Sequence, residues 1–263
     1  MSNWFSVDPK EHLKGKTAIV LGGNSGIGEA SARALAAAGA QVVISGIPAD
    51  QCASVANDIN REGGEAIAVS CDATKQQEIT SLIAATVEAY GGIDIAVSTC
   101  GIAVPRQDIL TFSPEQWRHI MSVNVDANFF FGQAVAKVMK TNKDGGRMVF
   151  VSSARGSFPM INAGPYSISK AAVMGIVRAF CIDLAQYNIT VNGIAPGIVE
   201  TQMTKKVFEE LPHQRDFVME RTPLKNTGTV DDMAAAILLF CLPESRYTSG
   251  QTLILDGGWS VNS

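Results

Sequence analysis

Histidine and cysteine are both scarce in this chain, and neither is spaced for a metal site or a disulfide framework. The 263 residues include three histidines and five cysteines. The cysteines are odd in number and widely separated, and no histidine stands near one at the spacing of zinc ligands. We therefore expect reduced thiols, no bound metal and a cytoplasmic protein, because disulfides persist mainly in oxidising compartments.

Long apolar runs and blocks of like charge are also missing. The longest apolar stretch near the end, residues 234–242, is too short to cross a bilayer, and the first residues lack the apolar core of a secretory signal. The formal net charge is -4, and there is no basic stripe of the kind that nucleic-acid binding needs. We expect neither a membrane nor a nucleic acid as a partner.

What the chain does have is an alternation of short β-branched runs with longer helical stretches. Apolar strands that alternate with helices predict a parallel sheet covered on both faces. We expect one α/β domain over residues 1–263, with about seven strands and a long helix from Pro114 towards Met139. The irregular segment at about residues 198–228 follows the sixth strand and is expected to form a lid over a substrate. The strand-like runs are TAIVLGG, QVVISG, EAIAVSCD, IDIAVSTCG, GGRMVFVSS, NITVNGIAPG and QTLILDGG.

A glycine-rich turn, GGNSGIG, joins the first predicted strand to the first helix. Gly22, Gly26 and Gly28 let the backbone turn tightly and approach a ligand closely. The N–H groups at the start of the next helix suit a pyrophosphate, so the turn indicates a dinucleotide. The spacing is GxxxGxG rather than the usual GxGxxG. A glycine-rich turn without a ligand is the alternative.

The second predicted strand ends in Ser45, Gly46, Ile47 and Pro48, with neither an acid nor a base. An acid there would accept a hydrogen bond from the ribose of NAD, whereas a base would bind the 2′-phosphate of NADP. An uncompensated phosphate is worse than a lost hydrogen bond, so NAD is favoured over NADP as the cofactor. Asp72, after the third strand, could bind adenine, cap the next helix, or do both.

Tyr166 and Lys170 are four residues apart in a helical run, so they lie on one face of the helix. A neighbouring ammonium would lower the pKa of the phenol and allow it to exchange protons near neutral pH. A solvated helix face is the alternative. The preceding strand runs into Ser152 and Ser153, and a serine there could donate to a carbonyl oxygen.

Together these motifs resemble the short-chain dehydrogenase/reductase family, in its single-domain branch, from residue 16 to residue 259. The resemblance implies a Rossmann-type, doubly wound, seven-stranded parallel sheet. It also implies reversible hydride transfer between NAD(P) and a small-molecule ketone or secondary alcohol. The motifs that carry it are GGNSGIG, MSVNV, SS at 152–153, YSISK at 166–170, NGIAPG and LDGGW.

The resemblance assigns a role to each catalytic residue. Tyr166 is the acid and base, and Lys170 lowers its pKa and holds the ribose of the nicotinamide. Ser153, thirteen residues before the tyrosine, orients the substrate oxygen, with Ser152 as the weaker candidate. Asn124 positions a water that relays protons to the lysine; its alternative reading is a buried polar residue that disturbs the helix.

The same resemblance implies the lining of two pockets. The cofactor pocket is expected to include Gly22, Asn24, Ser25, Gly26, Ile27, Gly28, Gly46, Asp72, Ala73, Cys100, Gly101, Tyr166, Lys170, Pro196, Gly197, Ile198 and Thr201. The substrate pocket is expected to include Ile102, Val104, Ser153, Arg155, Met160, Val199 and Met203. Arg155 is the one charge among the latter; it could pair with an acidic substrate group or serve a structural role.

Some residues depart from the family pattern, and other functions remain open. Leu21 stands where threonine is usual, and Ser98, Thr99 and Cys100 replace Asn-Asn-Ala before Gly101. A cofactor-binding regulator without turnover is one alternative. An epimerase, dehydratase or enoyl reductase is another, although enoyl reductases of the related branch space tyrosine and lysine more widely. The resemblance also implies a homodimer or homotetramer, with pairing through the helix that carries the tyrosine.

Overall fold

Seven parallel strands form one sheet in the order β3-β2-β1-β4-β5-β6-β7. The computed structural model describes residues 9–201, 204 and 212–262. The strand order reverses direction between β1 and β4, which creates a crevice at the carboxyl ends of these strands. The predicted parallel sheet is confirmed. Its strands are β1 (Thr17–Leu21), β2 (Gln41–Gly46), β3 (Glu65–Ser70), β4 (Ile95–Ser98), β5 (Gly146–Val151), β6 (Ile189–Pro196) and β7 (Thr252–Leu255).

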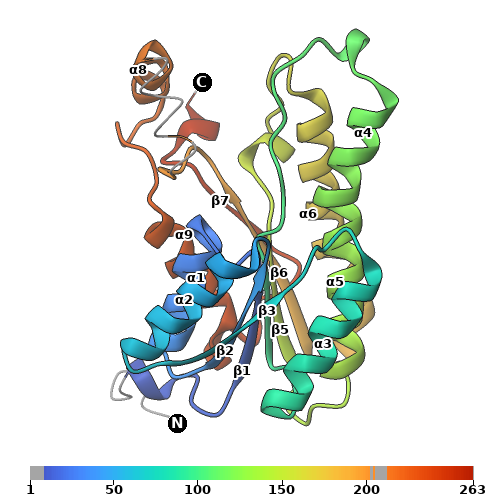
Figure 1. Cartoon of the computed structure of the whole chain (residues 1–263). Helices are drawn as coiled ribbons and strands as arrows, with labels where there is room; N and C mark the ends of the chain where they lie inside the picture. The colour runs from blue at the N-terminus through green and yellow to red at the C-terminus, as the bar shows by residue number, and fades with distance from the viewer. Residues whose placement is uncertain (1–8, 202–203, 205–211, 263) are drawn as a thin grey trace.

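Helices cover both faces of the sheet (Figure 1). One face carries α1 (Gly26–Ala37), α2 (Ala49–Arg61) and α9 (Val230–Cys241), and the other carries α3 (Gln76–Tyr90), α5 (Ala127–Met139) and α6 (Gly164–Leu184). Beyond the ends of the strands lie α4 (Pro114–Met121) and α8 (Pro212–Arg221), on opposite sides of the molecule (Figure 1). The short helical turns are η2 (Pro9–Glu11), η3 (Ile109–Thr111), η4 (Ser122–Asp126), η5 (Ala154–Gly156), η6 (Ala185–Tyr187), η7 (Pro243–Ser245) and η8 (Trp259–Val261).

The apolar side chains of the central strands divide between two cores. Along β1, Ala18 and Val20 face the core beneath α1 and α9. Ile19 and Leu21 face the core beneath α3, α5 and α6. All five residues of β1 are buried, as expected for a strand with helices on both sides. The carboxyl end of β1 is thereby held rigidly where the glycine turn begins.

The predicted helix from Pro114 to Met139 is interrupted. A capping box of Ser113 and Gln116 starts α4, but residues Ser122–Asp126 form a π-helical turn, η4, before α5 begins. Just after this turn the Asn128 side chain, on α5, donates to the Asn124 carbonyl inside it at 2.8 Å. π-helical turns within helices are frequent at functional sites, and this one directs the buried Asn124 side chain towards the strand ends.

The segment that the sequence predicts as a lid contains α8. Its residues 202–203 and 205–211 lie outside the described part of the chain, and they include Met203. On the described side, Val199 pairs with Gly228 through an isolated parallel bridge, and Thr201 accepts and donates hydrogen bonds with Thr204. These contacts fix the start of the segment next to the end of β6.

Candidate active site

A cleft of about 1530 Å³ lies at the carboxyl ends of β1, β2, β3 and β4. It is lined by the glycine turn, by the ends of these strands, by part of α4 and η4, and by residues 200–201 and 230–231. The predicted cofactor residues that line it are Gly22, Asn24, Ser25, Gly26, Ile27, Gly28, Gly46, Asp72, Ala73, Cys100, Gly101 and Thr201.

The glycine turn has the geometry that a dinucleotide requires. Gly22 and Gly26 have φ angles of 80° and 55°, in the left-handed region that favours glycine. A Cβ on Gly28 would strike the Gly22 carbonyl oxygen, so only glycine lets α1 start this close to β1. Ser25 is the N-cap of α1, and its side chain caps no backbone N–H. The N–H groups of the first helical turn therefore stay open to an anion in the cleft, which fits a pyrophosphate.

At the far end of the cleft, Asn24 organises the turn after β2. Its amide donates to the Ile47 carbonyl at 3.2 Å and to Gln51 Oε1 at 3.0 Å. Gln51 lies on α2 and lines the cleft, although no sequence signal marked it. A polar residue one turn into the helix that follows β2 is the feature that could have done so.

Arg33 also lines the cleft, but its charge is already compensated. The guanidinium pairs with Glu29 at 2.9 Å, Asp58 at 3.2 Å and Glu62 at 3.0 Å. Burial is the largest single effect and lowers the pKa of Arg33. The hydrogen bonds to Glu29 and Asp58 and the charges of Glu29 and Glu62 outweigh it, so the pKa is raised overall. A base on α1 therefore lines the cleft, but three carboxylates neutralise it.

Asp72 lies at the cleft and holds the turn after β3. One carboxylate oxygen accepts from the Thr74 N–H at 3.1 Å and from the Thr74 hydroxyl at 2.7 Å. The hydroxyl hydrogen bond is the largest cause that lowers the pKa of Asp72. The N-cap position of α3 belongs to Lys75 instead, so Asp72 stabilises the turn that precedes the helix.

Tyr166 lies near the start of α6, and Ser153 lies just after the end of β5. Burial raises the pKa of Tyr166, while a hydrogen bond with Ser153 and the charge of Arg155 oppose that rise. The phenol is thus neutral near pH 7 and can donate a proton. Ser153 is buried, and its Oγ accepts from the Arg155 N–H at 3.2 Å.

Lys170 is buried beside Tyr166, and its ammonium bonds the backbone of β5. Its Nζ lies 6.0 Å from the centre of the Tyr166 ring and donates to the Val151 carbonyl at 3.0 Å. Burial lowers its pKa to about 8. The role in lowering the pKa of Tyr166 that the sequence predicts for Lys170 stays a prediction; the hydrogen bond with Ser153 and the charge of Arg155 act in the same direction.

The two adjacent serines have separate environments. The Ser152 hydroxyl donates to the Lys170 carbonyl at 2.7 Å, so it ties β5 to α6. Ser153 is the serine that opposes the rise in the pKa of the Tyr166 phenol. Both side chains are buried. As consecutive residues in extended chain at the end of β5, they point to opposite sides.

Asn124 joins three parts of the site and is completely buried. Its amide nitrogen donates to the Ile102 carbonyl at 3.0 Å and to Ser169 Oγ at 2.9 Å. Its oxygen accepts from the Ile102 N–H at 2.7 Å. A Cβ on Gly101 would lie 2.8 Å from Lys170 Nζ and 3.3 Å from Asn124 Oδ1, so the backbone, the lysine and the asparagine are in close contact.

The polar side chains that replace the usual family residues after β4 form hydrogen bonds within the site. Thr99 donates to the carbonyls of Leu21 and Gly22, each at 3.1 Å, which joins β4 to the glycine turn. Ser98 donates to Asn128 Oδ1 at 2.6 Å. Asn128 was not predicted as a site residue; its position one helical turn after Asn124 is the signal that could have found it.

Cys100 follows these residues and lies on the cleft. Its Sγ is 3.7 Å from the Val123 carbonyl oxygen. Burial raises the pKa of the thiol to about 11, so the thiol stays protonated at neutral pH. This position suits a small packing residue next to the cofactor cleft.

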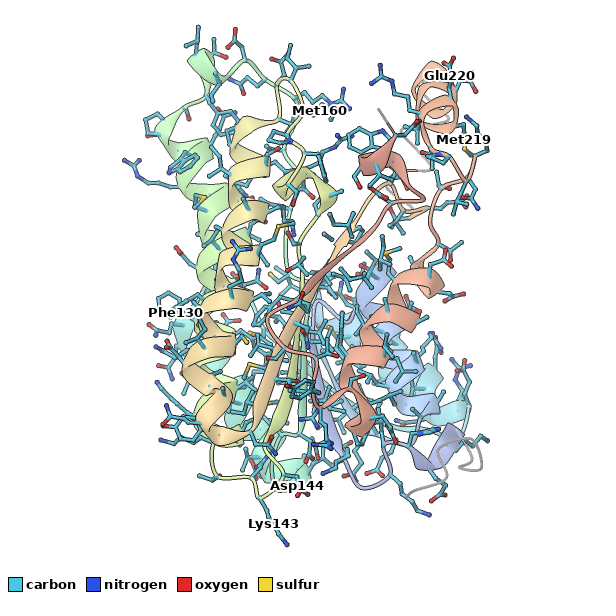
Figure 2. All side chains as sticks on the ribbon, turned by 180° about the vertical axis from the view of Figure 1, so that it is seen from behind. Phe130, Lys143, Asp144, Met160, Met219 and Glu220 are labelled. Atoms are coloured by element: carbon cyan, nitrogen blue, oxygen red, sulfur yellow. The ribbon has the colours of Figure 1, made fainter. Side chains whose placement is uncertain are left out.

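The predicted substrate residues are spread over several environments. Ile102 lines the cleft, Val104 and Met160 are half-buried, and Arg155 stacks on Trp259 with its guanidinium carbon 4.4 Å from the ring centre. Val199 is buried in the core beneath α1 and α9. Figure 2 places Met160 ahead of α6 and Met219 and Glu220 on α8, on opposite sides of the same end of the molecule.

The remaining predicted cofactor residues follow β6. Pro196 is buried and ends the strand, and the Gly197 N–H donates to the Leu255 carbonyl at 2.8 Å. Ile198 is half-buried and accepts from the Gly228 N–H at 3.0 Å. Thr201 lies over the glycine turn, since a Cβ on Gly26 would be 3.9 Å from its methyl group.

Two kinds of feature do not occur in the described part of the chain. Over residues 9–201, 204 and 212–262, no group of three or more histidine, cysteine, aspartate or glutamate side chains is placed to hold a metal ion. None of the helices described there has the length and apolar character needed to cross a membrane.

Comparison with known proteins identifies the family. A family model described as "Enoyl-(Acyl carrier protein) reductase" matches residues 22–260. The chain is 36% identical over 246 residues to the 7alpha-hydroxysteroid dehydrogenase of Escherichia coli (strain K12), with 94% of each chain covered. It is 32% identical over 250 residues to the gluconate 5-dehydrogenase of Gluconobacter oxydans (strain 621H), covering 95% of this chain and 96% of that protein.

A solved structure supports the same assignment. The structure of a 7 alpha-hydroxysteroid dehydrogenase complexed with NADH and 7-oxo glycochenodeoxycholic acid has a TM-score of 0.90 to this chain at 35% identity. The match covers 96% of this chain and 97% of the other. The family resemblance inferred from the motifs is thereby confirmed. The chain belongs to the short-chain dehydrogenase/reductase family and is an NAD(P)-dependent oxidoreductase that acts on CH–OH groups.

Proposed function

We propose that Ser153, Tyr166, Lys170 and Asn124 carry out reversible oxidation of a secondary alcohol to a ketone at the inner end of this cleft. The observation that carries the proposal is the position of the buried Lys170 ammonium, which lies against Gly101 on the lining of the cofactor cleft and 6.0 Å from the centre of the Tyr166 ring. The bound nicotinamide supplies or accepts the hydride. Everything else in the reaction falls to residues of this chain.

The proton moves through Tyr166. In the direction of ketone reduction, the neutral phenol donates its proton to the carbonyl oxygen, while the Ser153 hydroxyl donates a hydrogen bond to the same oxygen. In the direction of alcohol oxidation, the phenolate accepts the hydroxyl proton. Because burial raises the pKa of Tyr166, the oxidation rate is expected to increase as the pH rises above neutral.

Lys170 and Asn124 hold the site in shape. The Lys170 ammonium uses one N–H on the Val151 carbonyl, and within the described residues its remaining N–H groups have no partner, so they can bind the hydroxyl groups of the nicotinamide ribose. Asn124 fixes the backbone at Ile102 and contacts α6 through Ser169. Relay of protons through a water held by Asn124 remains part of the proposal.

We also propose a preference for NAD over NADP. The described residues at the end of β2 offer no uncompensated base, since Arg33 already pairs with three carboxylates. A 2′-phosphate would therefore stay without a counter-charge. Calorimetric titration with NAD(H) and NADP(H) tests this preference. Ile47→Arg, at a position that is 57% exposed on the cleft, should shift binding towards NADP(H).

The matching relatives are named as dehydrogenases of hydroxysteroids and of gluconate, which supports a hydroxylated substrate. We therefore select gluconate, 7-oxo-glycochenodeoxycholate and short hydroxy acids, each with a neutral derivative, as the first substrate panel. The description of the family model names enoyl reduction, so an enoyl thioester belongs in the same panel. The spacing of four between Tyr166 and Lys170 favours the carbonyl reaction.

The decisive experiment for the proposed function is Tyr166→Phe. Turnover of any active panel compound should fall about 100- to 10,000-fold, the usual contribution of a general acid or base, while NAD(H) binding stays near the wild-type value. Tyr187→Phe is the matched control, because Tyr187 is 39% exposed on η6. Full activity in Tyr166→Phe would refute the assignment of the proton donor.

A further inference from the structure

Arg155 is held next to the reacting groups by two contacts. Its backbone N–H donates to Ser153 Oγ, which fixes the start of its side chain. Its guanidinium lies on the indole of Trp259, 4.4 Å from the ring centre. A guanidinium stacked in this way keeps the N–H groups on its edge free for a planar acceptor such as a carboxylate.

A second arginine lies near the first. Arg106 is exposed, and the next residue, Gln107, donates its N–H to the Asn162 carbonyl at 2.9 Å. This bond ties the loop after β4 to the loop ahead of α6. Burial lowers the pKa of Arg155, and the charge of Arg106 lowers it further.

The pair has no counter-charge within residues 9–201, 204 and 212–262. The ion pairs there involve other cations, and Arg106 and Arg155 belong to none of them. Arg33 shows the contrast, with three carboxylates around one guanidinium. A half-buried cation beside a second cation is unfavourable unless an anion joins them.

The reacting groups are within electrostatic reach of Arg155. Its charge lowers the pKa of Tyr166, after the larger effects of burial and of Ser153. A molecule with its oxygen at Tyr166 and Ser153 can therefore place an anionic group at Arg155. The body of that molecule would lie beside the rings of Trp259 and Phe158, whose centres are 6.3 Å apart on the lining of one pocket.

We propose that the substrate is a secondary alcohol or ketone that carries a carboxylate, and that Arg155 and Arg106 bind this carboxylate. The inference rests on the proposed function, because it places the reacting oxygen at Tyr166. Arg155 makes the direct, stacked contact. Arg106, on the exposed side, adds charge and contributes to attraction of the anion.

The test compares each acid of the panel with a neutral form of the same molecule. The probes are gluconate with gluconamide, 7-oxo-glycochenodeoxycholate with its methyl ester, and short hydroxy acids with their amides, assayed with NAD(H) and NADP(H). For compounds that are turned over, the acid should be preferred about 100-fold in kcat/KM, the scale of a desolvated charge pair. Arg155→Met should remove this preference mainly through KM, and Arg106→Met should reduce it about 10-fold.

Three variants separate charge recognition from structural damage. Arg118→Met is the matched control, since Arg118 is an exposed arginine that pairs with Glu115 at 3.5 Å, and it should leave the preference intact. Arg155→Lys keeps the charge but loses the stacked geometry, and it should retain part of the preference. Arg106→Met alters an exposed side chain, so its effect does not depend on whether Arg155→Met folds.

The outcomes distinguish this inference from the proposed function. Two results would overturn the inference while the oxidoreductase proposal stands. The first is equal turnover of the acid and neutral forms by the wild type. The second is an acid preference that survives in both Arg155→Met and Arg106→Met. If the cofactor binds and no compound is turned over, the proposed function fails. Calorimetric titration of the acids into the wild type and Arg155→Met, with cofactor present, then decides the inference: binding only to the wild type supports it, and any other result refutes it.

Discussion

Asn124→Ala would remove a network on which both the fold and the site depend. The substitution deletes two hydrogen bonds to the backbone of Ile102, at 2.7 Å and 3.0 Å, and one to Ser169 at 2.9 Å. Each lost bond costs about 1 kcal/mol when a partner is left partly buried, so we expect a loss of about 3 kcal/mol in the free energy of unfolding. For a domain of this size that corresponds to a decrease of about 6–12 °C in Tm.

Asn60→Ala is the matched control for this experiment. The Asn60 side chain also forms two hydrogen bonds with one backbone residue, since it donates to the Ala66 carbonyl at 2.9 Å and accepts from the Ala66 N–H at 2.7 Å. It lies on α2 and touches no reacting group. Thermal melts and kcat on the same substrate should show that both variants lose stability, whereas only Asn124→Ala also loses kcat.

Two results would refute this reasoning in different ways. A melting temperature for Asn124→Ala within about 2 °C of the wild type would mean that the network contributes little to the fold, against the estimate from its three bonds. A clear loss of stability with unchanged kcat would leave the network as purely structural and would remove Asn124 from the proposed catalytic set.

Three further predictions follow from other parts of the structure. Burial lowers the pKa of Lys170 from 10.5 to about 8, so between these pH values the unfolded chain holds a proton that the folded chain has released. The free energy of unfolding of the wild type should therefore rise with pH across this window by up to about 3 kcal/mol relative to that of Lys170→Met. The same pH dependence of the unfolding free energy in both proteins would contradict this. Gly101→Ala places a Cβ 2.8 Å from Lys170 Nζ, so kcat should fall with little change in Tm; unchanged kcat would mean that the ammonium position is unimportant. Ile182 on α6 is 77% exposed, and the expected dimer or tetramer should dissociate in Ile182→Glu, measured by light scattering after gel filtration; a wild-type monomer would refute the predicted pairing.

The sheet and the glycine turn could be predicted because local sequence determines them. The run at β1 is apolar at every position after Thr17, which is typical of a strand covered on both faces, and the structure buries all five residues. Gly28 is required by a contact only six residues away in the chain, with Gly22. Short-range constraints of this kind leave a clear signal in one sequence.

The parts that could not be predicted depend on long-range contacts. The direction of the Lys170 ammonium is set by the Val151 carbonyl on β5, and the π-helical turn at Asn124 is set by bonds to Ile102 and Ser169. The neutralisation of Arg33 needs acids from α1, α2 and the residue after α2. Trp259 could not be placed against Arg155 from spacing alone, because more than a hundred residues separate them.

The π-helical turn η4 makes this part of the chain sensitive to length. Removing one residue from Ser122–Asp126 would let α4 and α5 join as a regular helix with their faces nearly unchanged, because the wider π-helical turn takes up one extra residue. The buried face of α5, with Phe131, Val135 and Met139, would stay against the sheet, but Asn124 would lose the backbone position from which it bonds Ile102 and Ser169. A single-residue deletion in this turn should therefore leave the fold largely intact and disturb the site, whereas a deletion in the regular part of α5 would rotate the residues after it by about 100°.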